Sequence, residues 1–175
     1  MASAETKFSE DQNRLFARFE ELGIESRTVL HPATHTVAQS SAIDKDLPGG
    51  QTKNLFLKCK KGGIYLIVAQ SDSEIKLNQL HKRIGSGRLS FAKAELLVEL
   101  LGVQPGSVTP FALINDHAVR VRVILDARMM EHEFLNYHPL INTATTNISR
   151  SDLLRFIEAC GHRPKVMALS GEQPI

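Results

Sequence analysis

The chain has 175 residues, of which 42% are hydrophobic, and a formal net charge of +2 at pH 7. This length can bury one substantial core, and no Pro-, Gly- or Ser-rich linker divides the chain, so we expect one domain over residues 8–169. The charge is too small to indicate nucleic-acid binding by itself, and no apolar run is long enough to span a membrane. Residues 1–7 lack a targeting signal, so we expect a disordered N-terminus, a C-terminal tail at residues 170–175 and a cytoplasmic protein.

The first half of the chain predicts a helix followed by a hairpin of two strands. Ser9 and Gln12 have the spacing of a capping box, and the apolar residues that follow at helical spacing end at Gly23. Apolar runs at residues 53–58 and 64–68 flank a Gly-Gly turn, which predicts a β-hairpin with both faces covered. Shorter predicted elements are a strand at residues 28–30, a helix that begins at residues 36–39, and a loop at residues 47–51.

The second half of the chain alternates helices with extended segments. Helices are predicted at residues 77–84, 92–101 and 153–160, each ended by a glycine, and strands at residues 119–125, 134–137, 143–148 and 165–169. The strand at residues 119–125 has one apolar face and one partly basic face. Because helices and strands interleave irregularly and one hairpin is present, we predict a mixed α/β (α+β) domain.

Lys53 is the first candidate for a functional residue. It stands at the beginning of an apolar strand, where the fold alone would favour an apolar side chain. A buried ammonium is costly unless a partner or a ligand uses its charge. Other basic residues flank this strand or a Gly-Ser-Gly turn, namely Lys58, Lys60, Lys61, Lys82, Arg83 and Arg88. Such charges commonly solvate a surface, but a groove that meets a few phosphates of an RNA end needs no more than these.

Three motifs stand far apart in the chain, in a recognisable order. They are TKNLFL at residues 52–57, GVQPG followed by SVTPF at residues 102–111, and HPLINTAT at residues 138–145. Together they resemble the YbaK/prolyl-tRNA synthetase-associated domain family of aminoacyl-tRNA editing proteins. Within that family the chain is similar to the freestanding ProX type (PrdX-like), which removes alanine from mischarged proline tRNA. The resemblance covers residues 8–169 and implies a curled mixed sheet that forms a partly open barrel surrounded by helices.

The motifs contain no group suited to covalent catalysis. The chain has no G-x-S-x-G motif, its two cysteines lack a flanking signature, and no pair of carboxylates lies near the motifs. An aminoacyl ester is already activated, so a positioned water and stabilisation of the developing oxyanion suffice for hydrolysis. The resemblance implies an aminoacyl-tRNA deacylase without a covalent intermediate, whose proton acceptor is the substrate's 2′-hydroxyl or a backbone carbonyl. His138 is an alternative base, although a histidine before a proline in a loop also has a structural interpretation.

We expect specific roles for residues of the three motifs and for two basic residues beside them. Lys53 supplies positive charge beside the terminal nucleotide, the backbone of residues 102–106 binds the aminoacyl group, and Gly106 and His138 complete the catalytic set. The residues expected to bind the substrate are Asn54, Gly102, Pro105, Ser107, Thr109, Asn142 and Thr143, and those expected to bind RNA are Lys58 and Arg88. A G-x-x-P-G sequence is also an ordinary connection between a helix and a strand, so a structural role for this loop stays open.

No cofactor or metal is expected. Cys59 and Cys160 lack C-x-x-C spacing, and Pro32 disfavours the helix that would align His31 and His35 as ligands. The expected partner is aminoacyl-tRNA, bound through its acceptor stem and 3′ end, with prolyl-tRNA synthetase or an elongation factor as transient partners and no membrane. Two alternatives stay open: hydrolysis of another aminoacyl-tRNA such as Cys-tRNA(Pro), and a non-catalytic domain that binds tRNA or a synthetase.

Overall fold

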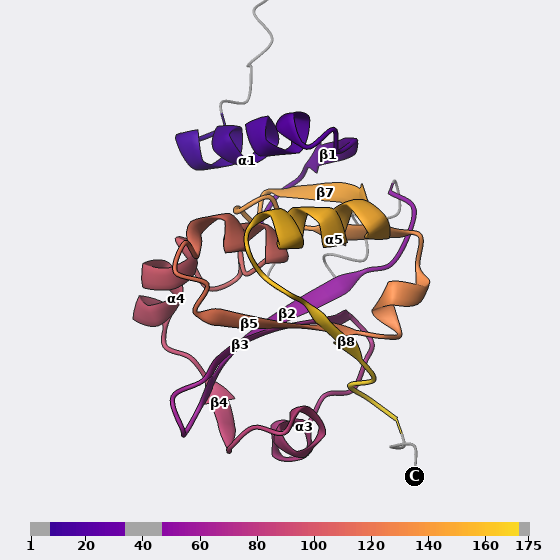
Figure 1. Cartoon of the computed structure of the whole chain (residues 1–175). Helices are drawn as coiled ribbons and strands as arrows, with labels where there is room; N and C mark the ends of the chain where they lie inside the picture. Colours follow the sequence, from indigo (N-terminus) through magenta and orange to yellow (C-terminus); the bar gives the residue numbers. More distant parts are fainter. Residues whose placement is uncertain (1–7, 34–46, 172–175) are drawn as a thin grey trace, which may run out of the picture.

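Two β-sheets and the helices packed on them make up residues 8–33 and 47–171, the part of the chain that the computed structural model describes (Figure 1). The elements are α1 (Glu10–Glu21), β1 (Ser26–Leu30), β2 (Thr52–Cys59), β3 (Ile64–Gln70), α3 (Leu77–Ile84), β4 (Leu89–Phe91), α4 (Ala94–Leu101), the 3-10 helix η2 (Pro110–Asn115), β5 (Val121–Asp126), the 3-10 helix η3 (Met129–Glu131), β6 (Phe134–Tyr137), β7 (Ala144–Ser149), α5 (Arg150–Ala159) and β8 (Lys165–Met167). The predicted helix at residues 36–39 and the predicted N-terminal segment 1–7 lie outside the described residues.

The larger sheet has five strands in the order β4-β2-β3-β5-β8. β2 is antiparallel to both of its neighbours, β3 and β4, whereas β5 runs parallel to β3 and to β8. The pairing of Lys58 with Ile64 beside the Gly-Gly turn confirms the predicted hairpin. Because parallel and antiparallel pairs occur in one sheet, the predicted mixed α/β class is confirmed.

The smaller sheet has three antiparallel strands in the order β1-β7-β6. A parallel bridge between Gly50 and Leu135 connects the segment before β2 to this sheet. The pairing ends there, because the hydroxyl of Thr52 donates to the carbonyl oxygen of Asn136 (2.6 Å). If the ladder continued, this oxygen would accept a hydrogen bond from a backbone amide instead. We expected one sheet curled into a partly open barrel, and the described strands instead form these two sheets.

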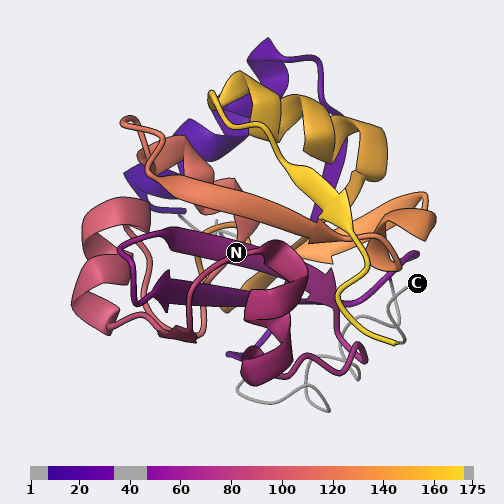
Figure 2. The same ribbon diagram turned by 60° about the horizontal axis from the view of Figure 1, so that its bottom comes forward.

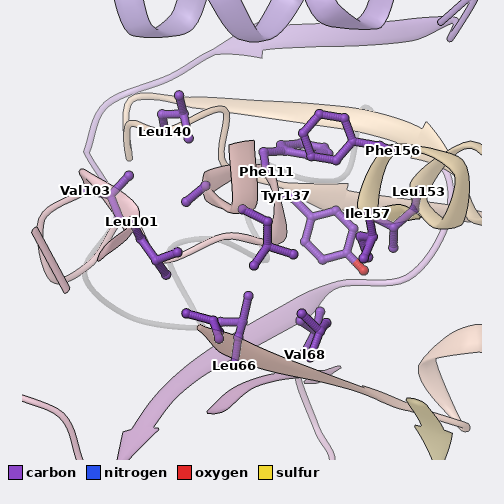
Figure 3. Packing of buried hydrophobic residues seen from close by; sticks show 14 of the residues in the cluster. Leu66, Val68, Leu101, Val103, Phe111, Tyr137, Leu140, Leu153, Phe156 and Ile157 are labelled. Atoms are coloured by element: carbon purple, nitrogen blue, oxygen red, sulfur yellow. The ribbon is translucent and has the colours of Figure 1, made fainter. Parts of the chain in front are cut away.

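The larger sheet has a hydrophobic core on each face, as the apolar hairpin predicts. Side chains alternate along β3, so Leu66 and Val68 point to one face and Ile67 to the other. The main core lies on the Leu66 face, where η2, α4 and α5 pack (Figure 3). The second core lies on the Ile67 face and is covered by α3 through Leu80 (Figure 2).

Phe111 occupies the centre of the main core (Figure 3). Its ring centroid lies 5.1 Å from that of Phe19 on α1, 5.6 Å from that of Phe156 on α5 and 5.6 Å from that of Tyr137 on β6, all edge to face. Such pairs stabilise a core beyond the effect of buried area. The sequence pattern does not predict η2, which begins when Thr109 Oγ1 accepts a hydrogen bond from the Phe111 amide (3.3 Å).

The remaining elements match their predictions with small shifts at the ends. The final strand stops at Met167, and α4 begins at Ala94 because Lys93 before it is extended. β4 was not predicted, since a strand of three residues leaves no periodic pattern. Among the described helices, none is long and apolar enough to cross a membrane.

Candidate functional site

The glycine loop, residues 102–106, follows directly from the end of α4. Gly102 ends the helix with a φ of +65°, and Gly106 has a φ of +91°, a left-handed conformation that glycine adopts without strain. Val103 is buried in the main core and fixes the loop, whereas Pro105 and both glycines are exposed. The backbone of this loop is therefore held in place and open to a ligand.

The second loop follows β6 and contains the HPLIN motif. Leu140 is buried in the main core at a φ of +69°, a conformation that non-glycine residues rarely adopt and that is found disproportionately at functional sites. A Cβ built on Gly106 would lie 3.8 Å from Asn142 Nδ2. The structure thus brings together Gly106 and Asn142, two predicted site residues from separate motifs.

The ring of His138 is held in one tautomer. Nδ1 lies 2.9 Å from the carbonyl oxygen of Ala144, which can only accept, so in the neutral ring Nδ1 carries the proton and Nε2 keeps its lone pair. No group in the described part of the chain is hydrogen-bonded to Nε2. Burial lowers the pKa of His138 below its ordinary value, the bond to Ala144 opposes this shift, and His31 adds to it. A neutral ring with a free Nε2 can accept a proton.

His31 was not predicted as a site residue, yet it lies beside His138. The two ring centroids are 6.1 Å apart, and His31 Nε2 lies 2.7 Å from Thr145 Oγ1. The backbone amide of His31 donates to the carbonyl of Thr143 (3.0 Å), which continues the pairing of β1 with β7. The sequence signal that could have found it is weak: His31 directly follows the predicted strand at residues 28–30.

Lys53 and Asn54 point to opposite faces of β2. Lys53 pairs with Ala69 and shares the face of the second core, where its Nζ donates to the carbonyl of Ser73. The Ser73 hydroxyl in turn donates to the buried carboxylate of Asp126 (2.7 Å). The glycine loop and the HPLIN loop pack on the other face, so the structure does not bring Lys53 to them.

Asn54 lies on the face of β2 that carries the main core. It pairs with Val68, a main-core residue that points towards Tyr137 (Figure 3). Its Oδ1 is buried and, in the described part of the chain, has no hydrogen-bond partner. Buried polar atoms are nearly always paired, so an unpaired acceptor at a predicted site residue indicates a position that a ligand can fill.

Lys58 and Arg88 are brought together by the pairing of β2 with β4. Lys58 pairs with Ser90, and the amide of Lys60 donates to the carbonyl of Arg88 (2.9 Å). Both predicted RNA-binding side chains are exposed and line one groove of about 700 Å³. Lys58 stands five residues after Lys53, which is about 17 Å along a strand.

Three other predicted substrate-binding residues have roles in the loops themselves. Ser107 is buried, and its amide donates to the Gln104 carbonyl (3.0 Å) and closes the turn of the glycine loop. Thr109 is fully buried and begins η2, so its hydroxyl does not face the glycine loop's open side. Thr143 is exposed at the end of the HPLIN loop.

The two thiols and the buried phenol of Tyr137 are unsuited to proton transfer or attack. Burial raises the pKa of Cys160 to about 11, so its reactive thiolate is scarce, and Cys59 is buried. Burial also raises the pKa of Tyr137 well above its ordinary value. Within residues 8–33 and 47–171, no three His, Cys, Asp or Glu side chains cluster as they would to hold a metal ion.

Known proteins match the chain over most of its length. A family model described as an aminoacyl-tRNA editing domain matches residues 31–156. The prolyl-tRNA synthetase associated domain-containing protein 1 of Bos taurus is 37% identical over 172 residues, which cover 95% of this chain and 97% of that protein. The prolyl-tRNA editing protein ProX of Acetoanaerobium sticklandii is 34% identical over 156 residues, which cover 89% of this chain and 95% of that protein.

A solved structure, described provisionally as a trans-editing enzyme for prolyl tRNA synthetase, has a similar fold. It aligns with a TM-score of 0.73 and 21% sequence identity, covering 95% of this chain and 100% of that one. At this identity the likeness concerns the fold alone. Because the family model spans most of the chain and the relatives align nearly end to end, the chain belongs to the YbaK-type aminoacyl-tRNA editing domain family, as its three motifs predicted.

Proposed function

We propose that this protein is a trans-editing deacylase that hydrolyses Ala-tRNA(Pro) in the cytoplasm. The observation that carries the proposal is the neutral His138 ring, with its free Nε2, on a loop that meets the glycine loop. The relatives named for prolyl-tRNA editing and for a prolyl-tRNA synthetase associated domain support proline tRNA as the substrate class. Prolyl-tRNA synthetase or an elongation factor would deliver this substrate.

The reaction needs a water, a proton acceptor and a site for the oxyanion. The water oxygen bonds to the ester carbonyl carbon while its proton passes to His138 Nε2, directly or through the substrate's 2′-hydroxyl. Backbone amides of the glycine loop stabilise the negative charge that develops on the carbonyl oxygen. The bond to the ribose 3′-oxygen then breaks, that oxygen takes up the proton, and alanine leaves.

The RNA end would cross the beginning of β2. Because Lys53 and Asn54 face opposite sides, the backbone of the terminal nucleotide can meet the ammonium on one side while the aminoacyl group meets the amide on the other. The unpaired Asn54 Oδ1 would accept a hydrogen bond from the substrate's α-ammonium group. Lys58 and Arg88 would bind where the unpaired 3′ end joins the acceptor stem, about 17 Å further along the strand.

The preference for alanine follows from the limits of binding energy. A synthetase pocket shaped for proline rejects the smaller alanine weakly, because each missing methylene contributes only about 1–3 kcal/mol. A second site that admits only the smaller residue corrects the error. Cysteine is close to alanine in size, so Cys-tRNA(Pro) is the nearest competing substrate.

A panel of charged tRNAs tests the proposal. Purified Ala-tRNA(Pro), Cys-tRNA(Pro), Pro-tRNA(Pro) and Ala-tRNA(Ala) would each be mixed with the protein, and the loss of ester followed under single-turnover conditions. We expect the first to be hydrolysed fastest and Pro-tRNA(Pro) to persist. Binding without hydrolysis of any of the four would show a non-catalytic tRNA-binding domain instead.

The pH dependence of deacylation is expected to report the lowered pKa of His138. The base must be neutral, and burial keeps the ring neutral below the ordinary histidine pKa of 6.5. The midpoint of the acid limb of kcat/KM should therefore lie below pH 6.5. His138→Gln should lower the plateau about a hundredfold and abolish the acid limb. An acid limb with its midpoint above pH 6.5, or one that persists in the variant, would assign the proton transfer to another group.

Gly106→Val is expected to impair deacylation more than it lowers stability. Its φ of +91° is strained for any side chain, at about 1–2 kcal/mol, but among the described residues, chain neighbours aside, only Asn142 lies within 4 Å of the added Cβ. Displacement of the loop should lower kcat/KM about a hundredfold. Gly23→Val is the matched control, because Gly23 also has a positive φ and an added Cβ meets no atom of the residues that the structure describes within 4 Å, chain neighbours aside. Equal losses of activity in both variants would assign the loop a purely structural role.

A further inference from the structure

Two grooves meet at Arg88 on the surface formed by β4 and α3. The β4 groove has a volume of about 700 Å³, and its basic and aromatic lining residues are Lys58, Lys60, Arg88, Phe91 and Lys93. The α3 groove has a volume of about 580 Å³ and is lined by His81, Lys82 and Arg88 among others. Because Arg88 lines both, the two grooves form one continuous surface.

The cations of this surface are not neutralised by the fold. In the part of the chain that the structure describes, none of them forms an ion pair with an acidic side chain. Two carboxylates, Glu95 and Glu99 of α4, also line the β4 groove without pairing with these cations. Unpaired basic residues that outnumber the carboxylates of a surface favour a polyanion as its ligand.

Phe91 supplies a flat apolar face within this charged surface. Its side chain is 64% exposed, the largest exposure among the large hydrophobic residues described as exposed. It belongs to β4, an edge strand that is held by pairing with Leu57, so the ring stands on a fixed backbone. A single exposed apolar residue is ordinary in proteins, but an aromatic ring beside unpaired cations is the combination that binds single-stranded RNA.

We propose that the β4 groove binds an unpaired nucleotide of the tRNA 3′ end by stacking its base on Phe91. The α3 groove then holds the phosphates of the adjoining acceptor strand through Lys82 and His81. This inference rests on the proposed function. Beyond the contacts expected of Lys58 and Arg88, it adds contacts from Lys60, His81, Lys82, Phe91 and Lys93. The surface lies about 17 Å from Lys53 along β2, so one unpaired RNA end has to cover only that distance.

The stacking contact can be measured without any catalysis, by binding of uncharged tRNA(Pro). Phe91→Ala and Phe91→Leu are expected to weaken binding about tenfold, whereas Phe91→Tyr keeps a flat ring and the parental affinity. A series of tRNAs with one abasic nucleotide at each unpaired 3′ position completes a double-mutant cycle. At one of these positions, the abasic nucleotide should weaken binding to the parent protein but not to Phe91→Ala. The base that this nucleotide lacks is the one that stacks on Phe91.

The phosphate contacts have a different signature. Lys82→Ala should weaken binding to every tRNA and reduce the slope of log affinity against log salt by about 0.7–0.9. Lys165→Ala is the matched control, since Lys165 is exposed on β8 at the opposite edge of the same sheet and should leave the slope unchanged. Phe134→Ala is the matched control for Phe91→Ala, because it removes another exposed phenylalanine ring. It should leave the affinity for tRNA unchanged.

Affinity that is unchanged in Phe91→Ala and Phe91→Leu, or additive effects at every abasic position, would overturn the stacking contact. The exposed ring on an edge strand would then indicate strand pairing with a protein. A failure of the proposed function would give a different result. The panel of charged tRNAs would then show no hydrolysis, while the protein would still bind tRNA and the Phe91 variants would still weaken that binding.

Discussion

Lys53→Met is expected to lower kcat/KM for Ala-tRNA(Pro) deacylation about a hundredfold. The ammonium is half-buried at the beginning of β2, and its only hydrogen bond in the described part of the chain is to the Ser73 carbonyl. Methionine keeps the length and apolar contacts of lysine and removes the charge. The loss of that one hydrogen bond should cost about 1 kcal/mol of stability, so the protein stays folded. Single-turnover deacylation and urea denaturation measure the two effects.

The matched control for Lys53 is Lys165→Met, which removes an exposed charge from β8 at the far edge of the same sheet. This variant should deacylate at the parental rate. If Lys53→Met also hydrolysed Ala-tRNA(Pro) at the parental rate, Lys53 would have only its structural contact with Ser73.

Phe111→Ala is expected to lower the free energy of unfolding by about 3–5 kcal/mol. The ring is fully buried and contacts aromatic rings from α1, α5 and β6 (Figure 3). It also joins the glycine loop, which leads into η2, to Tyr137, the residue before His138. Activity should therefore decline in parallel with stability. Urea denaturation measures the change, and the slope m should stay constant if the unfolding remains two-state.

Phe91→Ala is the matched control for Phe111, because it removes the same side chain from a site that is 64% exposed. Its stability should stay within about 0.5 kcal/mol of the parent. A loss of less than about 1 kcal/mol in Phe111→Ala would contradict the central position of this ring in the core.

Elements with local signals could be predicted from the sequence. The capping box at Ser9 and Gln12 begins α1, and Gly85 and Gly102 end α3 and α4 in the left-handed conformation that the sequence pattern requires. The hairpin of β2 and β3 followed from two apolar runs around a Gly-Gly turn. These signals lie within a few residues of the structure that they specify, so no tertiary information is needed.

The side of β2 that Lys53 faces could not be predicted. Leu55 and Leu57 point to one core and Phe56 to the other, so the apolar run has no period that distinguishes the faces. The packing of α3 on one face of the sheet and of η2, α4 and α5 on the other determines what surrounds each side chain of β2. Lys53 therefore lies on the face of the second core and Asn54 on the face of the main core.

Contacts between segments that lie far apart in the chain could not be predicted from the sequence either. The division into two sheets depends on a bridge from Gly50 to Leu135 and on the Thr52 hydroxyl, neither of which leaves a periodic pattern. The approach of His31 to His138 depends on the pairing of β1 with β7. Part of the candidate site is therefore a property of the fold and not of any one motif.

The most direct test of the proposed editing activity is a misacylation reaction. Prolyl-tRNA synthetase that lacks its own editing would charge tRNA(Pro) with radiolabelled alanine, with and without this protein, and a parallel reaction would contain proline. We predict that alanine fails to accumulate on tRNA(Pro) when the protein is present, that it accumulates with Lys53→Met, and that charging with proline is unchanged. Equal accumulation of Ala-tRNA(Pro) with and without the protein would contradict the account.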